Sequence, residues 1–366
     1  MRQAFRAAAA LAAVALLAAG CAKPSSTTTG SGSGAGTTSF KACMVTDTGG
    51  INDKSFNQSS WAGIQAAAAT NPNITAKYLP STTTSDYAKN ISTFISQKCG
   101  VIVTVGFLMG AATQAAALAN PKQKFAIVDC SYSSGCLTGP HEKNITQLVF
   151  NTAQDAFLGG YLAAGMTKTG KVATYGGMKF GTVTIYMDGF VDGVQYYNKQ
   201  HHTNVQVLGW SYPNQNGTFA GSFTNITAGQ TIGNTFIHDG ADILFPVAGG
   251  VGLGTAKAVQ TADTSGKKVA MFWVDTDGCV SAATYCKYFI TSVEKGISAA
   301  VKAAVLLANR GHGGGSYVGT LANGGAVLAP YHFYTSKVSA KLKAELATVK
   351  AAIISGKIVP QTKSPV

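Results

Sequence analysis

Short apolar segments alternate with helical stretches along most of this chain of 366 residues. The first set of apolar segments consists of ACMVTD (42–47), VIVTVG (101–106) and FAIVDC (125–130). Helices are expected between and after these segments, near 55–70, 84–97 and 109–119. Continuous apolar strands that are joined by helical crossovers are typical of parallel sheets covered by helices on both faces.

A second set of the same kind begins after residue 150. Its expected strands are KVATYGG (171–177), VQVLGW (205–210), DILFPVAGG (242–250) and VAMFWVDTDG (269–278). Its expected helices lie near 152–168, 186–199, 226–239 and 252–263. Two such sets in tandem predict an α/β protein that is built from two doubly wound, parallel-sheet lobes.

The last part of the chain predicts how the two lobes are joined. The strand KYFITSV (287–293) leads into a helix at 294–309, an extended run follows at 317–334, and a final helix occupies about 336–355. We therefore predict three crossings between the lobes, near 147–152, 290–293 and 317–328. This is the pattern of the type I periplasmic-binding-protein fold, in which a three-segment hinge borders a ligand cleft. The predicted first lobe comprises 40–149 and 292–318, and the second comprises 150–291 and 319–366.

The first 39 residues predict export and anchoring. Arg2 and Arg6 precede an apolar run and then Gly20-Cys21, which is typical of a signal peptide (1–20) that ends in a lipobox. The apolar run is shorter than the roughly 20 residues that span a bilayer. Residues 21–39 are rich in Ser, Thr and Gly, which predicts a lipid-bearing Cys21 followed by a flexible tether. We expect a lipid anchor at the extracytoplasmic face of the cell membrane; the alternative is ordinary signal cleavage with Cys21 unmodified.

Seven cysteines suit an exported protein, and six remain if Cys21 carries lipid. Two pairs bracket short loops, and the remaining two cysteines lie at strands that would be neighbours in a sheet. The simplest arrangement is three disulfides, Cys43–Cys99, Cys130–Cys136 and Cys279–Cys286. The alternative is a metal site, but the sequence has no CxxC motif and no histidine near any of these pairs, so we expect no metal.

Polar side chains follow several predicted strands. Asp47, Asp129, Asp275 and Asp277 each come directly after a strand, and Gly49-Gly50 turns the chain after Asp47. In open α/β sheets ligands bind beyond the carboxyl ends of the strands. Four carboxylates there predict a ligand rich in hydroxyl and N–H donors and disfavour a phosphate. The alternative for each of them is a capping role at the next turn or helix. Ser55 is the expected cap of the helix that follows Asp53.

Charge and motifs bear on other function classes. The formal net charge is +13, but the lysines are scattered, which favours a solvated basic surface over nucleic-acid binding. The glycine run 248–254 opens a helix after a strand, yet no acidic residue about 20 positions later has the role that a dinucleotide site requires, since Asp275 ends the next strand instead. No G-x-S-x-G motif is present, and the six histidines do not follow the strand ends that carry the acids. We therefore expect no enzyme and no cofactor.

The segment VTDTGGINDKSFNQSSWAG (45–63) closely resembles the basic membrane protein family, bacterial substrate-binding lipoproteins of nucleoside ABC transporters. The resemblance recurs in family order at VGFLMG (105–110), FAIVD (125–129), GSFTNITAG (221–229), PVAGGVGLG (246–254), WVDTDG (273–278) and TSVEKGI (291–297). It implies a monomeric receptor that closes over a nucleoside, with purines favoured, and delivers it to an ABC permease. The alternatives are a sugar or polyol ligand, or a sensor lipoprotein that is not coupled to transport.

The resemblance also implies roles for single residues. An aromatic ring from each lobe would stack on the base, here Phe56 and Phe223, with Phe107 as a second candidate from the first lobe. Lys295 would reach a ribose hydroxyl or pair with a carboxylate. The residues that we expect to contact the ligand are Asp47, Asn52, Asp53, Phe56, Asn57, Phe107, Asp129, Phe223, Gly249, Gly250, Asp275 and Lys295.

Overall fold

The computed structural model describes residues 39–139 and 141–366, and residues 38–366 form one compact unit. The predicted signal peptide, lipidated Cys21 and nearly all of the predicted tether fall outside the described residues. Within the described ranges, no helix is both long enough and apolar enough to cross a membrane.

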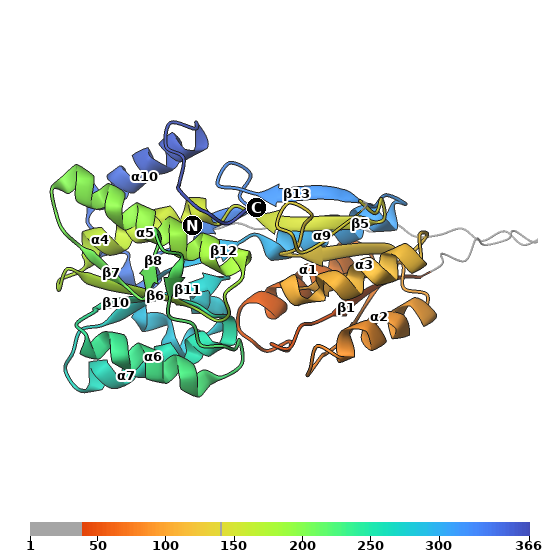
Figure 1. Ribbon diagram of the computed structural model, residues 1–366, viewed down its shortest axis with the longest axis horizontal. Helices are drawn as coiled ribbons and strands as arrows, with labels where there is room; N and C mark the ends of the chain where they lie inside the picture. Colours follow the sequence, from red (N-terminus) through yellow and green to blue (C-terminus); the bar gives the residue numbers. More distant parts are fainter. Residues whose placement is uncertain (1–38, 140) are drawn as a thin grey trace, which may run out of the picture. The chain divides into compact units, whose positions relative to one another are not determined.

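The first lobe is built around a sheet of six parallel strands, which Figure 1 shows together with helices α1, α2, α3 and α9. In sheet order the strands are β13 (Gly315–Gly319), β5 (Ile145–Phe150), β4 (Lys124–Val128), β3 (Val101–Val105), β1 (Phe40–Val45) and β2 (Ile74–Leu79). The helices are α1 (Phe56–Thr70), α2 (Asp86–Ser96), α3 (Gly110–Ala119) and α9 (Ile297–Asn309). Helices α1 and α9 cover one apolar face of this sheet, and α2 and α3 cover the other.

The second lobe repeats the plan with one antiparallel edge strand. In sheet order its strands are β14 (Ala326–Leu328), β12 (Phe289–Lys295), β11 (Ala270–Asp275), β10 (Ile243–Val247), β6 (Lys171–Gly176) and β7 (Gln206–Leu208). β14 runs antiparallel to β12. The main helices are α4 (Ala153–Met166), α5 (Gly181–His201), α6 (Ile226–His238), α7 (Gly252–Thr264) and α10 (Ala340–Ile354). A small hairpin, β8 (Trp210–Ser211) and β9 (Asn216–Gly217), and a short helix, α8 (Gly278–Ser281), complete it.

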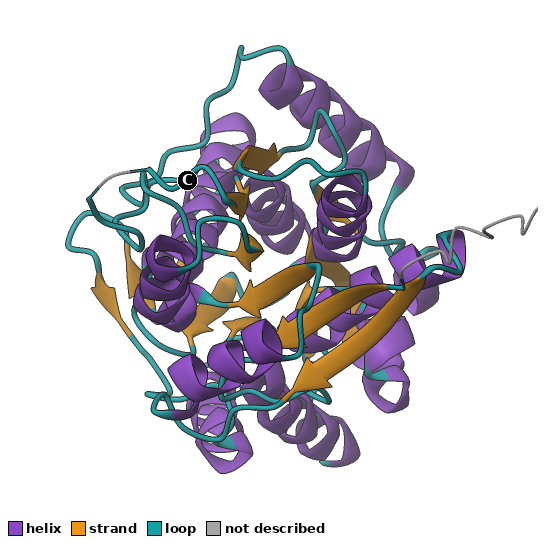
Figure 2. Cartoon of the chain, turned by 90° about the vertical axis from the view of Figure 1, so that its right-hand side faces the viewer, coloured by secondary structure: helices purple, strands orange, loops and turns teal. Residues whose placement is uncertain are grey.

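Helices flank the strands of both sheets, as the purple and orange elements of Figure 2 show. In the second lobe α4, α5 and α10 cover one face and α6 and α7 the other. The central strands β3, β10 and β11 are buried at every residue. This is the burial that a parallel sheet with two covered faces requires, and it explains the continuous apolar runs in the sequence.

The sequence patterns do not predict β2, and they place a crossing where β5 lies. β2 is an edge strand, and of its six residues only Ile74 is fully buried, so it lacks the apolar run of the central strands. Helix α5 also begins earlier than predicted, at Gly181 rather than near residue 186, directly after Phe180 in extended conformation.

The second crossing lies later than the predicted 290–293. β12 stays in the second sheet as far as Lys295, because Val293, Glu294 and Lys295 pair with β14. The chain leaves the sheet at Gly296 and enters α9 in the first lobe. The assignment of residues 292–295 to the first lobe is therefore wrong.

Backbone hydrogen bonds connect the three crossings to one another. The N–H of Asn151 donates to the carbonyl of Gly319 at 2.8 Å, and the N–H of Gly296 donates to the carbonyl of Gly325 at 2.9 Å. Gly319 and Gly325 approach so closely that a Cβ on Gly325 would overlap the backbone of Gly319. The hinge is thus a hydrogen-bonded unit in which glycine is required by close backbone contact.

The structure joins the six cysteines of the described chain as Cys43–Cys99, Cys130–Cys136 and Cys279–Cys286. We expected no histidine near a cysteine pair, but the fold brings one next to Cys279. The side chains of His332 and Asp277 and the sulfur of Cys279 lie within 4.8 Å of one another, but this sulfur is bonded to Cys286 and so is no thiolate ligand for a metal. His332 is 53 positions from Cys279 along the chain, so sequence spacing gives no sign of this contact.

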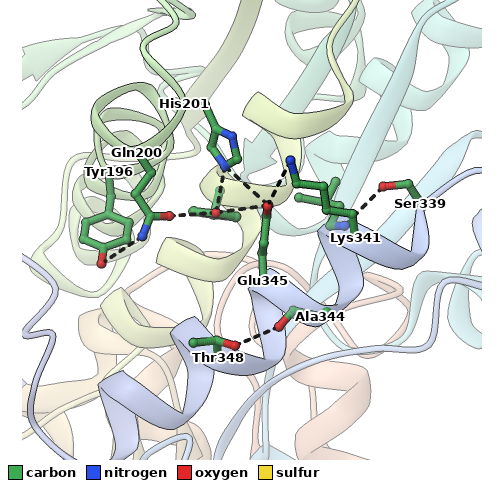
Figure 3. Close-up of polar contacts among 10 residues, drawn as sticks. Tyr196, Gln200, His201, Ser339, Lys341, Ala344, Glu345 and Thr348 are labelled. Atoms are coloured by element: carbon green, nitrogen blue, oxygen red, sulfur yellow. Dashed lines mark hydrogen bonds and ion pairs between the residues drawn. The ribbon is translucent and has the colours of Figure 1, made fainter.

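A buried-to-surface polar cluster fixes α10 to α4 and α5, and Figure 3 shows its side chains. The Glu345 carboxylate lies 3.3 Å from His201 Nε2 and 3.9 Å from Lys341 Nζ. The hydroxyl of Tyr161 donates to Gln200 at 2.8 Å and lies 3.3 Å from Glu345. Side chains from α4, α5 and α10 therefore meet at one carboxylate, that of Glu345.

Candidate ligand-binding site

A pocket of about 640 Å³, including the solvent at its mouth, is lined by residues from both lobes. Every residue that we predicted to contact the ligand lines this pocket except Asn52. Asn52 is exposed and is not part of the pocket lining. The lining residues with side chains used below are Asp47, Asp53, Phe56, Asn57, Phe107, Asp129, Phe180, Tyr186, Phe223, Asp275 and Lys295.

Asp47 ends β1 and faces the pocket from the first lobe. Its Oδ1 accepts hydrogen bonds from the Gly49 N–H at 2.8 Å and from the Asn57 side-chain amide at 2.7 Å. Burial raises the pKa of the Asp47 carboxyl, and these two hydrogen bonds oppose that rise. Asn57 therefore orients Asp47, and among the described residues Oδ2 has no hydrogen-bond donor.

Asp53, and not Ser55, caps helix α1. Its carboxylate accepts from the backbone N–H groups of Ser55 at 3.0 Å, Asn57 at 2.8 Å and Gln58 at 3.1 Å. Burial raises the pKa of the Asp53 carboxyl to about 6 although these hydrogen bonds oppose it. Because its oxygens are occupied by the helix terminus, Asp53 shapes the first-lobe loop.

Ser55 instead connects the two lobes. Its hydroxyl lies 2.9 Å from Asp275 Oδ2 and 3.1 Å from the carbonyl of Val274. The indole N–H of Trp273 donates to the carbonyl of Lys54 at 3.0 Å. The start of α1 is therefore held against the end of β11.

A buried charge cluster occupies the middle of the pocket. Lys295 Nζ donates to Asp129 Oδ2 across the lobes and lies 3.7 Å from Asp275 Oδ1. The Lys295 and Asp129 side chains are only 4% and 8% exposed. Asp275 Oδ1 also accepts from the hydroxyl of Tyr186 at 3.0 Å.

The pKa values of the cluster follow from burial and from these contacts. Burial raises the pKa of Asp129 to about 6, and the ammonium of Lys295 opposes that rise. Burial alone would lower the pKa of Lys295, but Asp129 and Asp275 raise it above its usual value. Asp129 and Asp275 both have left-handed backbones, with φ of 59° and 67°, a conformation that Asp tolerates better than most residues.

Asp277, the fourth strand-end acid, does not line the pocket. Its Oδ1 accepts from the Cys279 N–H at 2.9 Å as the cap of α8, and its Oδ2 lies 2.7 Å from His332 Nε2. The capping alternative therefore describes Asp277, whereas Asp47, Asp129 and Asp275 face the pocket.

Four phenylalanine rings contribute the apolar part of the site. Phe56 and Phe107 come from the first lobe, and Phe180 and Phe223 from the second. The Phe56 ring centroid lies 5.3 Å from Lys295 Nζ. Phe107 stacks on Phe180 with centroids 5.1 Å apart, and Phe180 stacks on Phe223 at 6.4 Å.

Sequence reasoning missed Phe180 and Tyr186. Phe180 follows β6 as Phe107 follows β3, so its strand-end position was a usable signal. The predicted helix began near residue 186, which placed Tyr186 at a helix end and hid the turn that carries Phe180. Gly249 and Gly250 lie at the end of β10, and Gly249 has a φ of 53°, so a side chain there would strain the backbone.

The site therefore offers acceptor-rich carboxylates, one buried ammonium and several aromatic faces. The ammonium has three donors, and Asp129 and Asp275 can engage two of them. Such a set can bind a neutral ligand with hydroxyl and amino groups and a flat ring.

The chain matches the ABC transporter substrate-binding protein PnrA-like family (Bmp) over residues 40–362. It is 32% identical to the ABC transporter nucleoside-binding protein BmpA of Lactococcus lactis subsp. cremoris, over 97% of both chains. It is 28% identical to basic membrane protein A of Borreliella burgdorferi, over 65% of this chain and 63% of that protein.

Among solved structures, an ABC transporter solute-binding protein of Aeropyrum pernix K1 superposes with a TM-score of 0.78 at 23% identity. The superposition covers 88% of this chain and 94% of that one. An ABC transporter periplasmic solute-binding protein from Actinobacillus succinogenes 130z with bound D-allose superposes with a TM-score of 0.60 at 14% identity, over 80% of this chain and 98% of that one. The predicted type I periplasmic-binding-protein fold is thus confirmed, and the chain belongs to the PnrA-like family of ABC transporter substrate-binding proteins.

Proposed function

We propose that this protein binds nucleosides, with purine nucleosides preferred, in the pocket between its lobes. The observation that carries the proposal is the combination of phenylalanine rings from both lobes with buried carboxylates in one pocket. Phe56 and Phe223 supply aromatic faces for the base. Asp47 and Asp129 accept hydrogen bonds from base N–H groups, and Asp275 and Lys295 bind the ribose hydroxyls. The nucleoside-binding relative from Lactococcus lactis supports this ligand class.

The proposal extends to how the ligand is used. A lipid on Cys21 would hold the protein at the extracytoplasmic face of the membrane, where a monomer would present its ligand to an ABC permease. A globomycin-treated culture, in which lipoprotein processing is blocked, should accumulate a precursor of higher mass. If mass spectrometry of the mature protein finds residue 21 without lipid, the anchoring part of the proposal is wrong.

Binding is tested by titrating purified protein with nucleosides, free nucleobases, ribose and nucleoside 5′-monophosphates. A nucleoside at a hundredfold excess over its Kd should raise the unfolding free energy by about 2.7 kcal/mol. A phosphate about 4 Å from one pocket carboxylate would be opposed by roughly 4 kcal/mol at an effective dielectric constant near 20, so monophosphates should bind far more weakly. If ribose stabilises the protein as strongly as every nucleoside, the pocket is a sugar site and the proposal fails.

The stacking role has its own test. The double variant Phe56→Ala/Phe223→Ala should lose nucleoside affinity, since stacking contributes roughly 1–3 kcal/mol per base in nucleic-acid complexes. Phe333→Ala is the control, because Phe333 is 63% exposed and lies outside the pocket. If the double variant binds purine nucleosides as tightly as the control, these rings do not hold the base.

A further inference from the structure

Three phenylalanine rings form a continuous stack that crosses the cleft. Phe107 begins the 3-10 turn after β3 in the first lobe, Phe180 immediately precedes α5, and Phe223 lies in the loop before α6. The Phe107 and Phe180 ring planes differ by 18°, and the Phe180 and Phe223 planes differ by 27°. Phe180 is the middle ring, so it is the member that connects the two lobes.

The spacing of this stack leaves no room for a ligand base inside it. A flat base between two aromatic faces needs centroids about 7 Å apart, because each carbon–carbon contact requires roughly 3.5 Å. The Phe107–Phe180 and Phe180–Phe223 centroids are separated by 5.1 Å and 6.4 Å. A base therefore does not lie between Phe180 and either neighbouring ring, and Phe180, which itself lines the pocket, limits the space that remains for the base.

Phe180 also fixes the orientation of Phe223. One side of the Phe223 ring lies so close to the backbone of Gly177 that a Cβ at that position would overlap the ring. Phe180 covers the ring as well, and both aromatic side chains line the pocket. Removing the Phe180 ring would free space next to Phe223 and allow Phe223 to turn into it.

We propose that Phe180, in contact with Phe107, is a specificity-determining residue that limits the size of the base which the pocket accepts. This inference rests on the proposed nucleoside binding and adds to it the residue that selects among nucleosides. Phe180→Ala widens the pocket next to the base, and Phe180→Trp narrows it. The two variants therefore shift selectivity in opposite directions.

The test measures Kd by calorimetry for adenosine, inosine, guanosine, cytidine and uridine, and for adenosines that carry bulky groups at C2, N6 or C8. Phe180→Ala should improve binding of at least one substituted adenosine relative to adenosine by about tenfold or more, the range in which apolar pockets discriminate size. Phe180→Trp should lower the purine-to-pyrimidine preference by a similar factor. Phe180→Leu tests the same gain in affinity for substituted adenosines while an apolar side chain remains at position 180.

Phe219→Ala is the matched control. Phe219 is a half-buried ring of the same lobe that packs edge-on against Trp210 at 5.9 Å and does not line the pocket. The Phe219→Ala variant should show the same ratios of Kd between the tested nucleosides as the unaltered protein. Unchanged ratios in the Ala, Leu and Trp variants at position 180, with nucleosides still bound, would overturn the role of Phe180. Failure of the unaltered protein to bind any nucleoside would instead overturn the proposed function, and this inference with it.

Discussion

The buried pair of Lys295 and Asp129 gives the sharpest prediction, because it requires no ligand. Lys295→Met keeps an unbranched apolar chain but leaves the Asp129 carboxylate, 8% exposed, without its cation. Removing one member of a buried ion pair typically lowers stability by about 3–5 kcal/mol. We expect a loss of that size in the unfolding free energy at pH 7, measured by chemical denaturation.

The loss should shrink in acid. Asp129 has a raised pKa in the folded protein, about 6 against 3.8, so the folded state binds more protons and stability increases as the pH falls between these values. Without Lys295 this pKa rises further. Protonation of Asp129 should therefore stabilise the variant more than the unaltered protein as the pH falls from 7 to 5. The difference in unfolding free energy between the two proteins should therefore be smaller at pH 5 than at pH 7.

Two variants control this prediction. Lys295→Met/Asp129→Asn removes both charges and should recover much of the stability that Lys295→Met loses. Lys287→Met removes a lysine that is 57% exposed and 3.8 Å from Asp263, a surface pair that should contribute little to stability because water screens it. If Lys295→Met costs no more than Lys287→Met, or costs the same at pH 5 and pH 7, the buried pair does not control stability as argued.

Three further predictions concern other contacts. Ser55→Ala removes the hydroxyl that bridges the lobes and should weaken ligand binding by about fivefold while scattering shows a more open protein; Ser60→Ala, whose hydroxyl bonds within its own helix, should do neither. Glu345→Gln should lower the unfolding free energy by about 1–2 kcal/mol in chemical denaturation and leave ligand affinity unchanged. A loss of affinity would contradict the position of Glu345 outside the pocket. Reducing the three disulfides should lower the Tm, and an unchanged Tm after complete reduction would contradict their stabilising role.

The sequence was sufficient for the two-lobe fold because buried parallel strands have continuous apolar runs. It was insufficient where burial is partial: β2 has a single fully buried residue and therefore no such run. The second crossing was misplaced for a related reason. The predicted helix begins at Glu294, but Glu294 and Lys295 pair with β14, and Lys295, buried in its ion pair, is the last residue of β12.

The lining of the pocket could be predicted where a side chain follows a strand, but contacts that depend on partners far along the chain could not. Asp47, Asp129 and Asp275 were found from their strand-end positions. Ser55 and Asp275 are 220 positions apart, so no local pattern can reveal that the serine bridges the lobes instead of capping α1. Asp277 shows the converse, since a strand-end acid paired with a distant histidine lies outside the pocket.

Some residues that line the pocket also make the contacts between the two lobes. Asp275 faces the pocket, yet its two carboxylate oxygens also contact Tyr186 and, across the cleft, Ser55. Lys295 likewise faces the pocket while it holds Asp129 of the opposite lobe. A ligand hydroxyl that engages Asp275 must therefore add to these contacts or replace one of them, and the affinity will depend on which occurs. Ser55 does not line the pocket, so its hydroxyl is one contact between the lobes that can be removed while every side chain that lines the pocket stays in place.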